Sequence, residues 1–455
     1  METAQLGDGW TARGQGRMGK RLKFEDMLAS VRRDLTGVPE HRKGRNIRYT
    51  IVEAGLGAFS VFFMQSPSFL AHQRDMQRKR GENNAHSLFG VERIPSDGQI
   101  RNLLDPVKPA HLRASFWEVY RCLDEGGYLD QHHGIEGTRL ISLDGSQYFS
   151  SQEIHCPQCR VSVREEETYY SHMVMVPVVC APKQEQVVCL DPEFITPQDG
   201  HDKQDCEQQA VKRWVKRNAV RFEPWSVTIL ADDLHCHQPF CELLLAHKMH
   251  FILTCKTESH EALYEEIALL EDVEGAISTK VVRKWNGRYH ERWVYRWAER
   301  LPFRADAKAL LLSWCELSIS NESTGKQLYH SAWATDLALD EERVVEVVAD
   351  GRSRWKVENE GFNVLKNRGY NFEHNYGHGQ QYLSMVLLTL LLLAFLFHSA
   401  LSLNCQMYQA IRRELVARRT FFNDLRALTR YLYFPNWQQL LAFMYQRLDL
   451  APAPS

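Results

Sequence analysis

The first part of the chain shows apolar residues at helical spacing. The clearest segments are 49–63 and 110–123, in which apolar side chains recur every three to four residues. Ser96 or Asp97 is suited to cap a further helix that begins directly after them. We therefore expect a helical domain over residues 24–137, with a role in DNA binding or in dimerisation.

The pattern changes to that of strands from residue 138. Apolar runs predict three strands, at 139–145, 169–179 and 186–190. A polar helix, a strand, a helix, a strand and a helix then follow in turn, at 203–218, 226–233, 237–248, 250–255 and 258–271. This order, β-β-β-α-β-α-β-α, is that of a ribonuclease H-like fold. We therefore expect an α/β protein built on a ribonuclease H-like mixed sheet.

Strand-like sequence then interrupts this order. Three segments rich in Val, Leu and Trp predict further strands, at 292–297, 309–314 and 343–348. We expect them to form a β-rich insertion over residues 276–350. The insertion divides the core of the fold into a first part, 138–275, and a second part, 351–405.

The two ends of the chain are basic. Residues 1–23 are rich in Gly and Arg without periodicity, which predicts a disordered tail. Residues 406–455 carry a series of arginines and predict a basic helical tail. The formal net charge of the whole chain is only −2, so these ends stand out and suggest a polyanionic partner. Ordinary solvated helices have the same composition.

The most apolar stretch, residues 382–397, is about as long as a membrane-spanning helix. A helix that is apolar all round is also typical of a buried core, and we expect this helix to pack against the sheet of the core. A membrane-associated protein is the alternative. The chain begins without an apolar signal and its eleven cysteines are an odd number, which indicates reduced thiols in a cytoplasm.

Three acidic residues form a candidate metal site. Asp144 and Asp232 each end a predicted strand, and these two strands lie side by side in the expected sheet. Glu358 falls on the apolar side of a basic helix over 352–368, where a carboxylate is costly unless it is paired or bound to metal. Each has a simpler explanation, a turn for the aspartates and an ion pair with Arg354 for Glu358. Together they predict a cluster that holds Mg²⁺ or Mn²⁺.

Cys156 and Cys159 form a second candidate metal site in the loop after the first strand. A Cys-x-x-Cys pair is half of a zinc site, which needs four ligands. Further Cys and His residues are near in sequence, but they form no second pair at a recognised spacing: His155, His172, Cys180 and Cys189. We expect reduced thiols that pack in or cap a hairpin, with structural Zn²⁺ as the alternative.

Four stretches carry a resemblance to a known family, at 143–149, 230–235, 354–366 and 369–379. They read Leu-Asp-Gly-Ser-Gln-Tyr-Phe, Leu-Ala-Asp-Asp-Leu-His, Arg-Trp-Lys-Val-Glu-Asn-Glu-Gly-Phe-Asn-Val-Leu-Lys and Gly-Tyr-Asn-Phe-Glu-His-Asn-Tyr-Gly-His-Gly. The chain resembles the DDE transposases of bacterial insertion sequences. It is most similar to the cut-and-paste type, in which a β-rich insertion precedes the last catalytic residue.

The resemblance implies a DNA transposase with two bound Mg²⁺ or Mn²⁺ ions and the catalytic residues Asp144, Asp232 and Glu358. Asp144 would contact both ions, and the other two residues one ion each. Such an enzyme hydrolyses the phosphodiester at each end of the element and then joins the freed 3′-OH ends to target DNA.

The chain departs from the family in two places. His235 stands where the family usually has an aromatic residue, which leaves Asp233 as an alternative to Asp232. The basic residue after the glutamate comes one position late, which leaves Glu360 as an alternative to Glu358. The helical-face argument favours Glu358 independently of the resemblance.

Five basic residues near the glutamate would bind phosphates of double-stranded DNA, both element ends and target: Arg352, Arg354, Lys356, Lys366 and Arg368. The resemblance also implies a homodimer or a higher oligomer on DNA, a cytoplasmic, nucleoid-associated location and no membrane. A ribonuclease H-like nuclease and an inactive, transposase-derived DNA-binding protein are the alternatives.

Overall fold

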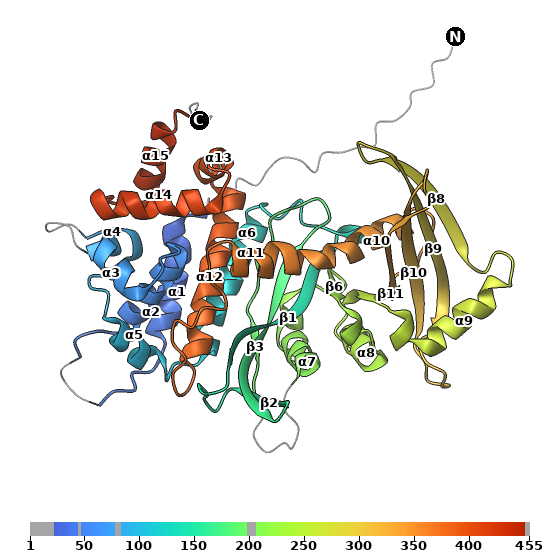
Figure 1. Ribbon diagram of the computed structural model, residues 1–455, viewed down its shortest axis with the longest axis horizontal. Helices are drawn as coiled ribbons and strands as arrows, with labels where there is room; N and C mark the ends of the chain where they lie inside the picture. The colour runs from blue at the N-terminus through green and yellow to red at the C-terminus, as the bar shows by residue number, and fades with distance from the viewer. Residues whose placement is uncertain (1–21, 44–46, 78–82, 198–205, 451–455) are drawn as a thin grey trace, which may run out of the picture.

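The protein is described here by a computed structural model that covers residues 22–43, 47–77, 83–197 and 206–450. The predicted disordered tail lies outside the described residues up to residue 21. Figure 1 shows a helical body, a central sheet with helices, and a group of long strands, arranged in a row. The chain is therefore a mixed α/β protein, as predicted at this level.

The first helices form one side of the helical body. They are α1 (Phe24–Thr36), α2 (Ile51–Phe63), α3 (Phe69–Gln77), α4 (Asn84–Phe89), α5 (Asp97–Leu104) and α6 (Arg113–Glu125). α2 begins with a capping box, because Thr50 accepts the backbone N–H of Glu53 and the Glu53 carboxylate accepts that of Thr50. The prediction that this part of the chain is helical is confirmed.

The last helices complete the same body. They are α12 (Leu383–Asn404), α13 (Gln406–Glu414), α14 (Arg418–Tyr431) and α15 (Trp437–Arg447). The Asn84 side chain donates hydrogen bonds to the carbonyls of Thr429 and Leu432, at 2.7 and 2.8 Å. The indole of Trp437 donates to the carbonyl of Leu88 at 3.0 Å. The prediction that residues 406–455 are helical is confirmed for the described residues up to 450, but these helices are not a tail, since they pack onto the first helices.

α12 is the one helix of the described residues that is long and apolar enough to cross a membrane. Its most apolar 18-residue window has a mean hydropathy of 2.3, and 89% of that window is buried inside the protein. It packs mainly against α2 and, among the strands, against β4 (Val188–Cys189). Burial is confirmed, but the expected packing on the sheet is largely wrong because helices cover most of its length.

The central part of the sheet has the strand order β2-β3-β1-β6-β7. β3 runs antiparallel to β1, whereas β6 and β7 run parallel to it. α7 (Glu207–Asn218) and α8 (Gln238–Ala246) lie before and after β6 in the chain. The strands are β1 (Arg139–Ser151), β2 (Arg160–Arg164), β3 (Glu167–Cys180), β6 (Val227–Ala231) and β7 (His250–Thr254), with β4 and β5 (Glu193–Ile195) paired to β3.

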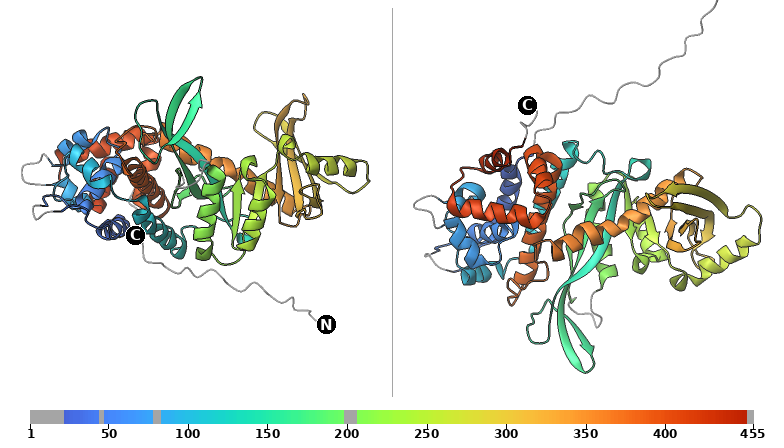
Figure 2. Two further views of the ribbon diagram at one scale, coloured as in Figure 1. Left: turned by 90° about the horizontal axis from the view of Figure 1, so that it is seen from below. Right: turned by 45° about the horizontal axis from the view of Figure 1, so that its top comes forward.

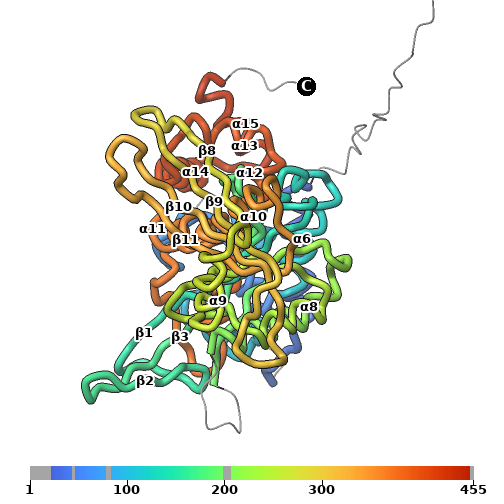
Figure 3. Tube along the Cα trace, turned by 90° about the vertical axis from the view of Figure 1, so that its right-hand side faces the viewer, coloured from blue at the N-terminus to red at the C-terminus, as the bar shows by residue number. Residues whose placement is uncertain are grey.

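β1 is longer than predicted. We expected it to end in a turn at Asp144, but it continues to Ser151 and remains paired with β3. With β2 it forms an arm that projects from the sheet (Figures 2 and 3). Asp144 still lies beside a boundary, because the pairing of β1 with β6 ends at Ser142. The third predicted strand, 186–190, is reduced to the two residues of β4.

The insertion extends the same sheet. After α9 (Glu261–Glu271), four long strands follow: β8 (Ser278–Trp285), β9 (His290–Pro302), β10 (Leu311–Asn321) and β11 (Gln327–Thr335). β11 pairs antiparallel with β7, with Trp333 opposite Thr254. The insertion therefore shares its backbone hydrogen bonds with the core and holds a fixed position beside it.

The last strand predicted for the insertion, 343–348, is a helix. α10 (Arg343–Arg352) buries Val344, Val347 and Val348, whose spacing of three and four residues is helical. The β-branched side chains favour a strand locally, but Asp340 accepts backbone N–H groups at the helix start and caps it. Burial on one face and the cap together outweigh the local preference for a strand.

The segment that carries Glu358 is not one regular helix. It consists of η6 (Ser353–Trp355), a 3₁₀ turn, then η7 (Val357–Phe362), a π-helix, and then α11 (Asn363–Asn367). A projection at 100° per residue is therefore wrong for it. The Glu358 side chain is 51% exposed and not on the buried side, which is formed by neighbours such as Val357. With α10 this segment crosses from the insertion to the helical body (Figure 1).

Candidate functional site

Asp144 and Asp232 come to equivalent positions on two neighbouring parallel strands. Ser142 of β1 pairs with Leu230 of β6, and each aspartate lies two residues further along its strand. Asp232 also accepts the backbone N–H of Leu234 at 3.1 Å, which fixes its carboxylate at the start of a short 3₁₀ turn. The predicted proximity of the two aspartates follows from this register.

Glu358 joins the two aspartates because η7 lies against β1 and β3. Its effect is visible in the pKa of Asp144, which is raised to about 7. Burial is the largest cause, the negative charge of Glu207 comes next, and the charges of Glu358 and Asp232 add to it, while Arg354 opposes the shift. The charges of Glu358 and Asp232 both act on Asp144, but among the described residues the three carboxylates are not a group whose ligand atoms all lie within 4.8 Å of one another. The predicted three-carboxylate metal site therefore stays a prediction.

Glu207, the first residue of α7, is a fourth acidic residue that the prediction missed. A Cβ atom at Gly145 would lie 2.5 Å from the Glu207 carboxyl carbon, so the glycine allows this carboxylate to approach the residue beside Asp144. His235 Nε2 lies 3.4 Å from Glu207 Oε1 and 4.0 Å from Asp232 Oδ1. An acidic residue in the first turn of a helix is too common to have been a signal.

Asp233 has a different role from Asp232. Its carboxylate accepts the backbone N–H of Lys256 at 2.7 Å and the hydroxyl of Ser259 at 2.6 Å, and it lies 3.2 Å from His260 Nε2. These contacts fasten the loop that follows β7. The geometry therefore favours Asp232 over Asp233 as the acidic partner of Asp144.

Glu358 and Glu360 also differ in their surroundings. Arg354 Nη2 lies 2.8 Å from Glu358 Oε1, which is the ion pair that the sequence offered as the simpler explanation. The same Glu358 charge reaches Asp144, so the ion pair and membership of the acidic group coexist. Among the described residues, Glu360 forms no ion pair and no side-chain hydrogen bond. We name Asp144, Asp232, Glu358 and Glu207 the acidic group.

The predicted DNA-binding residues do not form one surface. The Arg352 guanidinium lies over the rings of Trp293 and Tyr329, at 5.1 and 4.8 Å from their centroids. Lys356 is buried, and its ammonium donates to the carbonyl of Gln184. The prediction of a phosphate contact is therefore wrong for Lys356, because its charge is used inside the protein.

The remaining basic residues are more accessible. Lys366 Nζ lies 2.9 Å from Glu373 Oε1, and Arg354 is paired with Glu358 as described. Arg368 is exposed and forms no ion pair within the described part of the chain. A groove of about 400 Å³ opens beside this segment, lined by residues that include Arg352, Arg354, Trp355, Tyr329 and Trp333.

No family model matches the chain, and no curated protein matches it either. The resemblance to DDE transposases therefore remains a prediction from the residues quoted above. Any function has to be argued from the arrangement of the side chains themselves.

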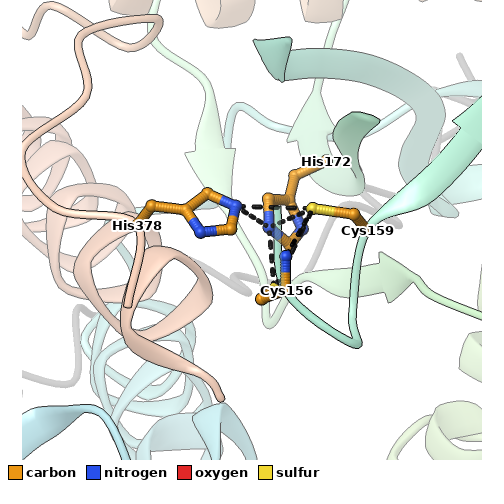
Figure 4. Close-up of side chains that lie close together, drawn as sticks. All are labelled: Cys156, Cys159, His172 and His378. Carbon is orange, nitrogen blue, oxygen red and sulfur yellow. Dashed lines mark hydrogen bonds between the residues drawn. The ribbon is translucent and has the colours of Figure 1, made fainter. Parts of the chain in front are cut away.

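Cys156 and Cys159 lie in a second, buried group together with His172 of β3 and His378 of the loop before α12 (Figure 4). Their sulfur atoms are 3.9 Å apart, and His172 Nε2 lies 3.6 and 3.4 Å from them. His378 Nε2 lies 3.4 Å from Cys159 Sγ and 3.1 Å from His172 Nε2. We name these four residues the Cys/His group. Sequence reasoning noted His172 but missed His378, which is 219 residues from Cys159.

A smaller group of three residues also has ligand atoms within 4.8 Å of one another: Cys236, Cys255 and His260. Four ligands are usual for a structural zinc site, and this group supplies three from Cys and His. It lies beside Asp233, which is 3.2 Å from His260 Nε2.

Proposed function

We propose that the chain is a metal-dependent DNA transposase of the DDE type, which cuts at the ends of an insertion sequence and joins the 3′-OH ends to target DNA. One observation carries the proposal. Asp144 and Asp232 lie at matching positions of two neighbouring parallel strands, each two residues beyond the Ser142–Leu230 pair, and the segment that carries Glu358 packs against β1.

The strand order supports a ribonuclease H-like core. β3 is antiparallel to β1, β6 and β7 are parallel to it, and helices separate the later strands in the chain. The sequence pattern predicted the neighbouring positions of β1 and β6 for that fold, whereas it did not predict β2. The β-rich insertion between β7 and the Glu358 segment also agrees with the family that the chain resembles.

The acidic group suits divalent cations. Carboxylate oxygens are the ligands that Mg²⁺ prefers, and several carboxylates held together repel one another until a cation or a proton neutralises them. Burial is the main cause of the raised pKa of Asp144, and repulsion from Glu207, Glu358 and Asp232 adds to it. When bound, two Mg²⁺ ions supply Lewis-acid stabilisation of the attacking and leaving oxygens of a phosphodiester.

The protein's own side chains hold the acidic group in position. Arg354 pairs with Glu358 and fixes its carboxylate, and the hydroxyl of Ser142 donates to the backbone carbonyl of Arg354 at 3.2 Å. That hydrogen bond joins β1 to the segment that carries the glutamate. His235, which is almost wholly buried, places Nε2 within hydrogen-bond distance of Glu207 Oε1, at 3.4 Å, and 4.0 Å from Asp232 Oδ1.

DNA is the substrate that the surroundings favour. The groove beside the Glu358 segment combines two guanidinium groups with the half-exposed ring of Trp355. Guanidinium groups bind phosphates, and exposed aromatic rings stack on bases. Arg368 adds a further exposed positive charge at the end of α11.

The proposal is tested with purified protein and labelled DNA that carries the sequences flanking its gene. We expect Mg²⁺-dependent cleavage at the element ends and joining of the cut 3′ ends to a second DNA. Asp144→Ala should do neither, whereas Glu360→Gln serves as the matched control and should do both. Hydrolysis without joining would identify a nuclease instead, and DNA binding without cleavage would identify an inactive relative of the family.

A further inference from the structure

We propose that Cys156, Cys159, His172 and His378 bind one structural Zn²⁺ ion. The proposal does not depend on the proposed function, because the four residues are separate from the acidic group. It replaces our expectation of packed thiols with the alternative that the sequence left open.

The distances within the group are those of a tetrahedral zinc site. With Zn–S bonds of about 2.3 Å and Zn–N bonds of about 2.05 Å, tetrahedral angles put two sulfurs about 3.8 Å apart, a sulfur and a nitrogen about 3.6 Å, and two nitrogens about 3.4 Å. The structure has 3.9 Å between the sulfurs, 3.4 to 3.6 Å between sulfur and nitrogen, and 3.1 Å between the nitrogens. One cation at the centre therefore reaches all four ligand atoms.

Two other arrangements explain the group less well. A disulfide requires about 2.05 Å between the sulfurs, and the two sulfurs here are 3.9 Å apart. Without a metal, the Nε2 atoms of His172 and His378, which are 3.1 Å apart, need a proton between them, because two bare lone pairs at that distance repel each other. A metal ion satisfies all four lone pairs at once. The Cys156 backbone N–H also points at Cys159 Sγ, at 3.4 Å, which stabilises a thiolate there.

His378 is presented to the group by a loop that is built for it. His378 Nδ1 lies 3.1 Å from the carbonyl of Gly379, so the proton on Nδ1 leaves Nε2 free as a ligand. The carboxylate of Asp105 accepts the backbone N–H groups that follow, those of Gln380, Gln381 and Leu383. Gly379 has φ +70°, and a Cβ there would overlap Asp105, so the close approach requires glycine.

The ligand set and its burial indicate a structural site. Two thiolates and two imidazoles select zinc over the hard cations that suit carboxylates. All four side chains are buried and fill the four positions of a tetrahedron, which leaves no position for a substrate. The ion would therefore stabilise the fold and take no part in chemistry.

The site joins three segments of the chain. Cys156 and Cys159 follow β1, His172 belongs to β3, and His378 lies between the Glu358 segment and α12. The ring of Tyr148 stacks on His172, with centroids 5.6 Å apart. A zinc ion here ties the arm of the sheet to the helical body, beside Phe149, which lies on the same strand as Asp144 and pairs with His172.

Metal analysis of the full-length protein tests the proposal. We expect one zinc per chain after purification without added metal, and a Co²⁺-substituted protein with the absorption of a tetrahedral site that contains thiolates. His378→Gln should weaken zinc binding by more than about tenfold, because loss of an outer hydrogen-bond partner alone costs that much. Cys236→Ser, from the smaller group, is the control and should retain one zinc.

Several results would overturn the proposal. They are wild-type protein that binds no zinc after refolding with zinc present, a Co²⁺ spectrum without sulfur-to-metal charge transfer, or zinc that is lost from Cys236→Ser and kept by His378→Gln. If His378→Gln does not fold, the Co²⁺ spectrum of the wild type decides. Activity on DNA plays no part in this test, so its outcome is independent of the transposase proposal.

Discussion

The acidic group and the Cys/His group are both connected to strand β1. Asp144 of the acidic group lies on this strand, and Cys156 and Cys159 of the Cys/His group follow it in the chain. The two groups differ in their exposure to solvent, their charge and their ligand atoms. In the acidic group the Glu358 side chain is 51% exposed, and burial together with neighbouring negative charges raises the pKa of Asp144. In the Cys/His group all four side chains are buried and their ligand atoms already stand at tetrahedral spacing. One site is open and under electrostatic strain, and the other is closed and preformed.

The difference fits the two functions that we propose for these sites. A site that binds substrate oxygens must keep open positions and exchange its ions, which suits carboxylates and Mg²⁺. A site that holds segments together must keep its ion, which suits soft ligands that fill every position. We therefore infer a labile metal site and a permanent one within one continuous sheet.

The largest expected effect comes from Asp144→Ala. Removal of a carboxylate shared by the acidic group should lower the rate of DNA cleavage by about 10³-fold or more, because metal-bound oxygens are stabilised mainly in the transition state. Zinc content should stay at one per chain. Cleavage rates and metal analysis on the same preparation measure both. If the variant lost its zinc together with its activity, the two metal sites would not be independent of each other.

The next effect separates the two neighbouring glutamates. Glu358→Gln should lower the cleavage rate by about 10²-fold, whereas Glu360→Gln should change it less than about threefold, since the charge of Glu358 acts on Asp144. Single-turnover cleavage at saturating Mg²⁺ is the measurement. The opposite ranking would mean that the π-helix presents Glu360 to the site.

The pH should affect the two sites differently. Protons compete with metal for Asp144, whose pKa is about 7, so the apparent affinity for Mn²⁺ should rise about tenfold per pH unit from pH 5.5 and level off above about pH 7. Zinc should stay bound over this range. Titration of Mn²⁺ into zinc-loaded protein at several pH values measures it, and an affinity independent of pH would contradict the pKa of Asp144.

Without Mg²⁺, the free energy of unfolding should also depend on pH through Asp144. A folded-state pKa above the unfolded value means that Asp144 stabilises the fold below about pH 4, and that this contribution is lost as the pH rises through about 7. The loss is at most about 1.4 kcal/mol per pH unit. Asp144→Asn should remove this dependence, so the variant should gain stability relative to wild type as the pH rises. Urea unfolding at pH 5 and 7.5 tests it.

The smallest effect concerns Glu207. Glu207→Gln removes the charge that contributes most, after burial, to the raised pKa of Asp144, so the pH at which Mn²⁺ affinity levels off should fall. The plateau affinity should weaken only about threefold. A plateau that stays at the same pH would remove Glu207 from the acidic group.

The local pattern of apolar and polar residues was sufficient to predict those helices and strands whose form is determined by their own residues. α2, with its capping box and apolar face, and the buried strand β6 were predicted for this reason. The strand predicted at 343–348 is a helix, because burial of one face of α10 and its cap outweigh the preference of valine for strands. The π-helix around Glu358 has no local signature at all.

The candidate sites also show that residues brought together by tertiary contacts are hard to predict from local sequence. Asp144 and Asp232 were found because strand order alone brings them together. Glu207 was missed because its approach depends on the glycine at 145, and His378 because its partners lie more than two hundred residues away. Ligands that meet through tertiary contacts leave no spacing to read in the sequence.

One titration tests the central claim most directly. Mn²⁺ is added to zinc-loaded wild-type protein and to Asp144→Asn at pH 7.5, with bound Mn²⁺ followed by its paramagnetic resonance and zinc followed in the same samples. We predict reversible Mn²⁺ binding by the wild type that is lost in Asp144→Asn, with one zinc retained in both. Mn²⁺ binding that survives in Asp144→Asn, or Mn²⁺ that displaces the zinc, would contradict the account.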